Sequence, residues 1–270
     1  MPSSNPAFSR FGGAGNGQQN LGWGAGPQQT YGGAPTQYDP YSAPSPYAAT
    51  GRAYMTMDDV VTKTGITFLV TVLTAAIVWS LPGTTGWGLA LPAVLVGLGL
   101  GLFISFKTIT NPAAILAYAA VEGVFLGAIS EAFEARFGGI VMQAVIGTFG
   151  VFAGMLVVYK TGAIRVTPKL TRWIIGALVG VLVLMFANII ASFFIDGGLG
   201  LRDGGPWAIV FSLVVIGVAA FSLLLDFDMA DEAIRRGAPA KFAWYIAFGL
   251  LVTVVWLYLE ILRLLSYFRD

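Results

Sequence analysis

Carboxylates gather near the end of this chain, in and beside two apolar segments. The stretch "FSLLLDFDMADEAIRR" carries four acids directly after an apolar run, namely Asp226, Asp228, Asp231 and Glu232. A further acid, Glu260, lies inside "WLYLEILRLL". A carboxylate in hydrocarbon costs roughly 3 kcal/mol, and acids within membrane spans commonly mark cation pathways or proton relays. The residue types therefore indicate the handling of cations or protons.

The composition excludes most other chemistry. The 270 residues include no Cys and no His, which removes disulfides, thiolate chemistry, His-based metal sites and His-dependent catalytic triads. The chain is 56% hydrophobic and 11% charged, whereas soluble domains carry about 25% charged residues. With a net charge of +1 and no basic stripe, nucleic acid is not an expected partner. We expect a membrane protein that is not an enzyme and has no cofactor or metal site.

The pattern of apolar runs predicts an all-α membrane protein with seven transmembrane helices. Each run has nearly the 20 residues that a span needs, and the runs cover 64–81, 88–106, 113–133, 139–159, 173–195, 207–226 and 242–266. Thr56 and Asp59 form a capping-box pattern that should open the first helix. Gly97 and Gly101 form a G-x-x-x-G pair, which we interpret as close packing rather than as a dimer face. The predicted membrane domain spans 55–270.

The first 54 residues form a separate segment of different composition. They are rich in Gly, Pro, Gln and Tyr, and such a segment cannot bury enough apolar surface to offset its ordering entropy. We predict a disordered tail. Its scattered aromatic residues leave open a contact with a protein partner.

Basic residues predict the orientation of the spans. With seven spans, the side shared with the N-terminus receives Arg52, Lys63, Lys107, Lys160, Arg165, Lys169, Arg172, Arg235, Arg236 and Lys241. The other side receives only Arg136, Arg202, Arg263 and Arg269. Because short cytoplasmic loops are enriched in Lys and Arg, the tail should be cytoplasmic and the C-terminus external.

Several polar residues fall at depth within the predicted spans, and each has two interpretations. Glu122 lies near the middle of the third span, either as a hydrogen-bonded packing residue or on an ion pathway. Glu131 shares a helix face with Glu134, at a solvated helix end or in a cation-attracting vestibule. Asn188, like Gln143, is of a type that hydrogen-bonds between helices, and the other interpretation of Asn188 is a residue of the ion pathway. Glu260 could simply pair with Arg263, three residues further on.

Four stretches resemble the transmembrane Bax inhibitor motif family, in particular its bacterial branch with a long cytoplasmic tail. They are "VEGVFLGAISEAFE", "GIVMQAVIGTFGVF", "FSLLLDFDMA" and "TVVWLYLEILRLLS". The resemblance covers about 56–268 and leaves the tail outside it. It implies seven helices, with one enclosed by the other six, in the bacterial plasma membrane.

The resemblance also implies a function. Bacterial members act as pH-sensitive calcium leak channels, in which an acid of the sixth helix and an acid of the seventh share a hydrogen bond that controls opening. The matching positions here are Asp226 and Glu260, with Glu in place of the usual Asp, and Glu122 matches a third-helix acid of some relatives. Lys107 is the local candidate for a basic residue that channel members carry near the end of the second helix. The expected transported species are calcium ions or protons.

Two points bear on this assignment. If the seventh helix begins at Lys241 and crosses straight, Glu260 lies roughly 28 Å along it, so a contact with Asp226 requires a longer sixth or seventh helix. Another bacterial branch is thought to inhibit a membrane-anchored protease. The alternative function is therefore a non-transporting regulator of membrane-protein quality control or stress, working through the tail.

Overall fold

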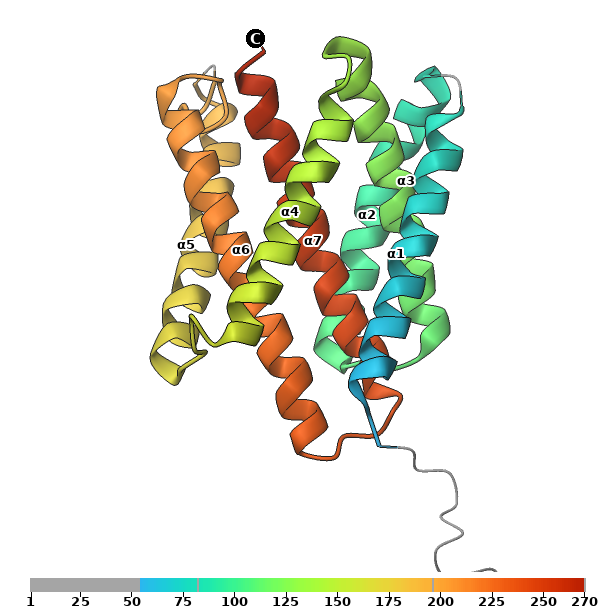
Figure 1. Ribbon diagram of the computed structural model, residues 1–270. Helices are drawn as coiled ribbons and strands as arrows, with labels where there is room; N and C mark the ends of the chain where they lie inside the picture. Colours follow the sequence, from blue (N-terminus) through green and yellow to red (C-terminus); the bar gives the residue numbers. More distant parts are fainter. Residues whose placement is uncertain (1–53, 82, 196, 270) are drawn as a thin grey trace, which may run out of the picture. The chain divides into compact units, whose positions relative to one another are not determined.

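The computed structural model describes residues 54–81, 83–195 and 197–269. Their secondary structure is seven helices without a named strand, and every helix is long and apolar enough to cross a membrane. The helices are α1 (Met57–Trp79), α2 (Gly83–Lys107), α3 (Pro112–Arg136), α4 (Ile140–Thr161), α5 (Pro168–Ser192), α6 (Pro206–Arg235) and α7 (Phe242–Tyr267). The all-α membrane fold is thus confirmed (Figure 1). The predicted tail lies outside the described residues, apart from Tyr54.

Local sequence signals explain where several helices begin. At α1, the Asp59 amide donates to the Thr56 hydroxyl at 3.2 Å and the Thr56 amide donates to the Asp59 carboxylate at 3.1 Å. This confirms the predicted capping box. Pro occupies an early position in α3, α5 and α6, where its missing N–H costs nothing. Asn111 and Thr167 cap α3 and α5.

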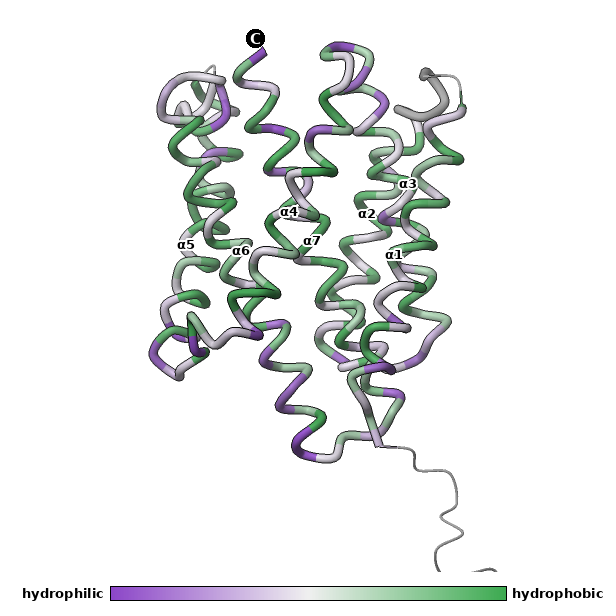
Figure 2. The backbone as a smooth tube through the Cα atoms, viewed as in Figure 1, coloured by the Kyte–Doolittle hydropathy of each residue, from purple (hydrophilic) through white to green (hydrophobic). Residues whose placement is uncertain are grey.

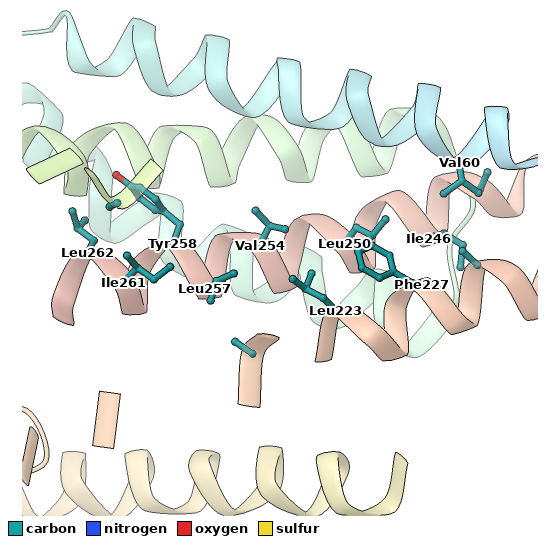
Figure 3. Close-up of a cluster of buried hydrophobic side chains, with 14 of the residues drawn as sticks. Val60, Leu223, Phe227, Ile246, Leu250, Val254, Leu257, Tyr258, Ile261 and Leu262 are labelled. Carbon is teal, nitrogen blue, oxygen red and sulfur yellow. The ribbon is translucent and has the colours of Figure 1, made fainter. Parts of the chain in front are cut away.

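The seventh helix is the core of the bundle. In the hydrophobic 18-residue stretch of this helix, 72% of the residues are buried, against 44% or less in the corresponding stretch of every other helix. It packs on α1, α3, α4 and α6, while α2 packs mainly on α3 and α5 packs on α6. Figure 3 shows Leu223 and Phe227 of α6 beside Leu250 and Val254 of α7 within one apolar cluster. That the other six helices enclose one remains a prediction.

The sixth helix is longer than its apolar run. The predicted sixth span ended at Asp226, but α6 continues to Arg235. Three ion pairs support the extension at helical spacing: Asp231 with Arg235 at 3.0 Å, Glu232 with Arg235 at 2.8 Å, and Glu232 with Arg236 at 2.6 Å. Figure 2 shows this end of α6 as hydrophilic. The end of the apolar run shows where α6 leaves the apolar region, and the helix itself continues further.

Glycines allow close helix contacts inside the chain. A Cβ at Gly101 of α2 would lie 3.1 Å from the Tyr118 ring of α3, and one at Gly97 would lie 3.6 Å from the Glu122 carboxylate. The G-x-x-x-G pair therefore packs on α3, as expected. On the other side of α3, a Cβ at Gly127 would lie only 2.5 Å from the Ala75 carbonyl of α1.

We predict that Gly127→Ala destabilises the bundle by about 1–3 kcal/mol, because backbone would have to move. Gly150→Ala in α4 is the matched control, since no atom lies within 4 Å of the added Cβ. Thermal unfolding followed by tryptophan fluorescence should show a lower midpoint for Gly127→Ala alone. Equal midpoints for the two variants would contradict the close α1–α3 packing.

Candidate functional site

The carboxyl of Asp226 lies inside the bundle, where α6 crosses α7. A Cβ at Gly249 would lie 3.7 Å from Asp226 Oδ1, so the absence of a side chain there lets the carboxyl approach α7. The nearby Thr253 hydroxyl interacts with the carboxyl and donates to the Gly249 carbonyl at 3.2 Å. Asp226 Oδ2 is shielded from solvent and accepts no hydrogen bond from any described residue. A buried acceptor without a partner is costly, which marks this carboxyl as a candidate site.

A cavity of about 220 Å³ adjoins this carboxyl. Its described lining comes from α2, α6 and α7 and comprises Ser105, Asp226, Met229, Tyr245, Ile246, Phe248, Gly249, Val252 and Thr253. Neither Lys nor Arg is among these residues. The hydroxyl and carbonyl oxygens beside the carboxyl are ligands that hard cations accept. Asp226 is the sole acid in this lining, and among the described residues no group of three or more acids is arranged to hold a metal ion.

Glu260 lies in a different environment, further along α7. Its side chain is only 2% exposed, and Arg263 Nη1 donates to both carboxylate oxygens, at 2.8 and 3.2 Å. Arg202, from the connection between α5 and α6, places Nη2 3.6 Å from Glu260 Oε1. The pair with Arg263 is the one that the spacing suggested, whereas nothing in the sequence indicated Arg202. Glu260 is therefore a neutralised, buried charge.

The structure does not bring Asp226 and Glu260 together. Asp226 lies beside Gly249 and Thr253, and Thr253 precedes Glu260 by about 10 Å along the helix. The longer α6 shifts Asp226 deeper into the bundle than expected, but not as far as Glu260. The shared hydrogen bond that the resemblance implied is thus absent between these two described residues.

Glu122 is separated from the Asp226 cavity by two aromatic rings. The Tyr118 hydroxyl donates to Glu122 Oε1 at 2.6 Å. The Tyr118 ring packs edge-on against Phe248 with the centroids 4.9 Å apart, and Phe248 lines the cavity. In this arrangement Glu122 is hydrogen-bonded and lies adjacent to the site.

The remaining predicted residues have other neighbours. Asn188 Oδ1 accepts from the Leu199 amide at 2.9 Å, so it holds the connection after α5 rather than a second helix. Glu134 accepts from the amides of Gly139 and Val141 at the start of α4, while its neighbour Glu131 is half-buried. Lys107 is exposed at the end of α2, two residues after Ser105 of the cavity lining.

We predict that Glu260→Ala destabilises the protein by about 3 kcal/mol, because it leaves the guanidinium groups of Arg202 and Arg263 without their buried partner. Glu232→Ala is the control, since its exposed pairs should contribute less than about 1 kcal/mol. The measurement is thermal unfolding in one detergent for both variants. Unfolding midpoints that fall equally would show that Glu260 is no more important to the fold than a surface acid.

Comparison with known proteins agrees with the motifs. The family model described as Bax inhibitor 1 like matches residues 5–270. The match begins near the N-terminus and so includes the tail, which the motif-based resemblance had left outside. Among curated proteins, none matches the chain. Because the family model covers nearly the whole sequence, this chain belongs to the Bax inhibitor 1 like family.

Proposed function

We propose that this integral membrane protein is a pH-sensitive cation leak channel, with calcium as the expected ion, in the bacterial plasma membrane. In the proposed orientation the N-terminus is cytoplasmic, because Lys and Arg are concentrated in the connections at the end where α1 begins. The observation that carries the proposal is the Asp226 carboxyl, buried beside a cavity with an oxygen that no described group satisfies.

A cation would supply what the surroundings of Asp226 lack. The described residues of the cavity lining include a carboxylate, hydroxyl groups and no basic side chain, so they offer a positive ion attraction without a competing ammonium or guanidinium group. A proton can satisfy the same oxygen. Competition between proton and cation for one carboxyl is a direct source of pH sensitivity that requires no histidine.

The two acids act at separate levels in this proposal. Asp226 is the group that binds the ion or proton. Glu260 lies further along α7, and its ion pair with Arg202 attaches the connection between α5 and α6 to that part of the helix. The gate therefore depends on Asp226 within its cavity and on the Glu260 cluster further along the helix. A direct carboxyl pair is not required.

Glu122 remains a proposed second pathway residue. It lies behind Tyr118 and Phe248, so an ion could pass from one carboxyl to the other only if these rings rotate. If the substitution Glu122→Gln leaves cation flux unchanged, Glu122 has a packing role alone.

The alternative function, a non-transporting regulator, is favoured by one observation. The family model extends over the tail as well as the membrane part, so the tail belongs to what family members share. On this alternative, a protein partner binds the tail and the buried acids are structural. A chain lacking residues 1–54 should keep cation flux if the channel proposal holds.

We predict that Asp226→Asn lowers calcium flux into proteoliposomes at least about tenfold and abolishes its pH dependence. Tenfold corresponds to about 1.4 kcal/mol of lost interaction with the ion. In the unsubstituted protein, flux should rise as pH increases, because the carboxyl attracts cations only when it is ionised. A calcium-sensitive dye inside the vesicles measures both effects.

Asp228→Asn is the matched control for this experiment. Asp228 lies two residues along α6, its carboxylate faces the Tyr159 hydroxyl at 3.5 Å, and it does not line the Asp226 cavity. Its flux and pH profile should stay close to those of the unsubstituted protein. If Asp226→Asn behaves like Asp228→Asn, the assignment of the pathway to Asp226 is wrong.

A further inference from the structure

A second feature of the bundle lies far along the chain from the acids, at the start of α5. Within 160–172 the sequence "KTGAIRVTPKLTR" contains four basic residues and no acid, namely Lys160, Arg165, Lys169 and Arg172. All four are exposed, and no ion pair joins any of them to a described acid. We call these four residues the basic hairpin. Figure 2 shows this end of α5 as hydrophilic.

The basic hairpin differs from three other basic residues at the same end of the bundle, each of which is paired with an acid. Arg235 and Arg236 are bound by Asp231 and Glu232, and Lys63 is bound by Asp59 at 3.0 Å. Lys160 and Arg165 do line a cavity that also contains Asp228 and Asp231, but Asp231 is already paired with Arg235 there. Positive charge is therefore less compensated at Lys169 and Arg172, on α5 itself, than at Lys63, Arg235 and Arg236.

A groove begins at Arg172, on the helix face that Lys169 shares, and follows α5 into its apolar part. It has a volume of about 430 Å³ and is lined by Arg172, Trp173, Gly176 and Ala177. Lys169, Arg172, Trp173 and Gly176 recur at three- and four-residue spacing, so they share one face of the helix. A Cβ at Gly176 would meet no atom within 4 Å. The groove is thus open where the helix enters the apolar region.

The position of α5 decides which kind of molecule can reach this groove. Among the other helices, α5 packs only on α6, so the other six helices leave most of its surface uncovered. Trp173 is 71% exposed beside the charged end, which is the arrangement typical of aromatic residues at the membrane–water interface. A soluble anion could bind the basic side chains, but it would make no favourable contact with the groove beside Trp173, which continues along α5 into the apolar region.

We propose that this face of α5 binds an anionic phospholipid, with the headgroup phosphate at Lys169 and Arg172 and the upper acyl region along Trp173, Gly176 and Ala177. Lys160 and Arg165 contribute attraction at longer range. The proposal is independent of whether the protein conducts ions. It assigns a binding site of defined chemistry to a helix that contributes nothing to the Asp226 cavity.

The test is native mass spectrometry of the purified full chain, incubated in detergent with equal amounts of phosphatidylglycerol and phosphatidylcholine of the same acyl chains. The unsubstituted protein should retain phosphatidylglycerol preferentially. Because each basic residue near an anionic surface contributes a factor of about five, the double variant Lys169→Gln/Arg172→Gln should lose most of the preference. Gly176→Leu, which fills the groove and keeps all charges, should lower retention of phosphatidylglycerol.

Two matched controls make the outcome decisive. Lys107→Gln/Lys241→Gln removes two basic residues at the same end of the bundle, and Gly154→Leu fills space on α4, where an added Cβ also meets no atom within 4 Å. Both should retain phosphatidylglycerol like the unsubstituted protein. Equal retention of the two lipids, or a preference that survives Lys169→Gln/Arg172→Gln, would overturn the proposal. So would displacement of the lipid by inorganic phosphate together with no effect of Gly176→Leu, since that result describes a soluble-anion site.

Discussion

Hydrocarbon solvates charge poorly, so the ionised carboxyls of Asp226 and Glu260 inside this bundle each need either a counter-charge or a polar cavity. The most buried helix, α7, takes part in both solutions, at two different positions along its length. Glu260 is neutralised by Arg263 of the same helix and by Arg202 from the connection before α6. Asp226 of α6 instead faces Gly249 and Thr253 of α7 and a cavity whose described lining has no basic residue. The packing of α1, α3, α4 and α6 against α7 fixes which solution each acid receives.

The separation of these two acids changes what a gate in this protein can be. A shared hydrogen bond would couple them directly, so that one proton would report on both. Here a change at Asp226 can reach Glu260 only through about two turns of α7. Such coupling requires movement of α7, or of the connection that Arg202 fastens to it. On the channel proposal, the Glu260 cluster sets how firmly that half of the bundle is closed, while Asp226 meets the ion.

Much of the fold follows from local sequence, and the candidate site does not. The apolar runs place all seven helices, and the capping box at Thr56 places the start of α1, because span length and capping are local properties. The end of α6 was missed because hydropathy detects the membrane, whereas the acid–Arg pairs beyond Asp226 continue the helix in water. The pair of Glu260 with Arg263 is visible from spacing alone. Arg202, Gly249 and Thr253 are tertiary neighbours, and no periodicity in one chain can assign them to these acids.

The central claim is that cations pass through the cavity beside Asp226, and the absence of cysteine from the chain allows a direct measurement. Thr253→Cys places a single thiol in the cavity lining, and Val157→Cys on the exposed face of α4 is its control. A positively charged, membrane-impermeant thiol reagent is added to proteoliposomes while calcium flux is recorded. The account predicts that the reagent modifies Thr253→Cys and blocks its flux, that Val157→Cys and the cysteine-free protein keep theirs, and that adding Asp226→Asn slows the modification. Full flux after complete modification of Thr253→Cys would contradict it.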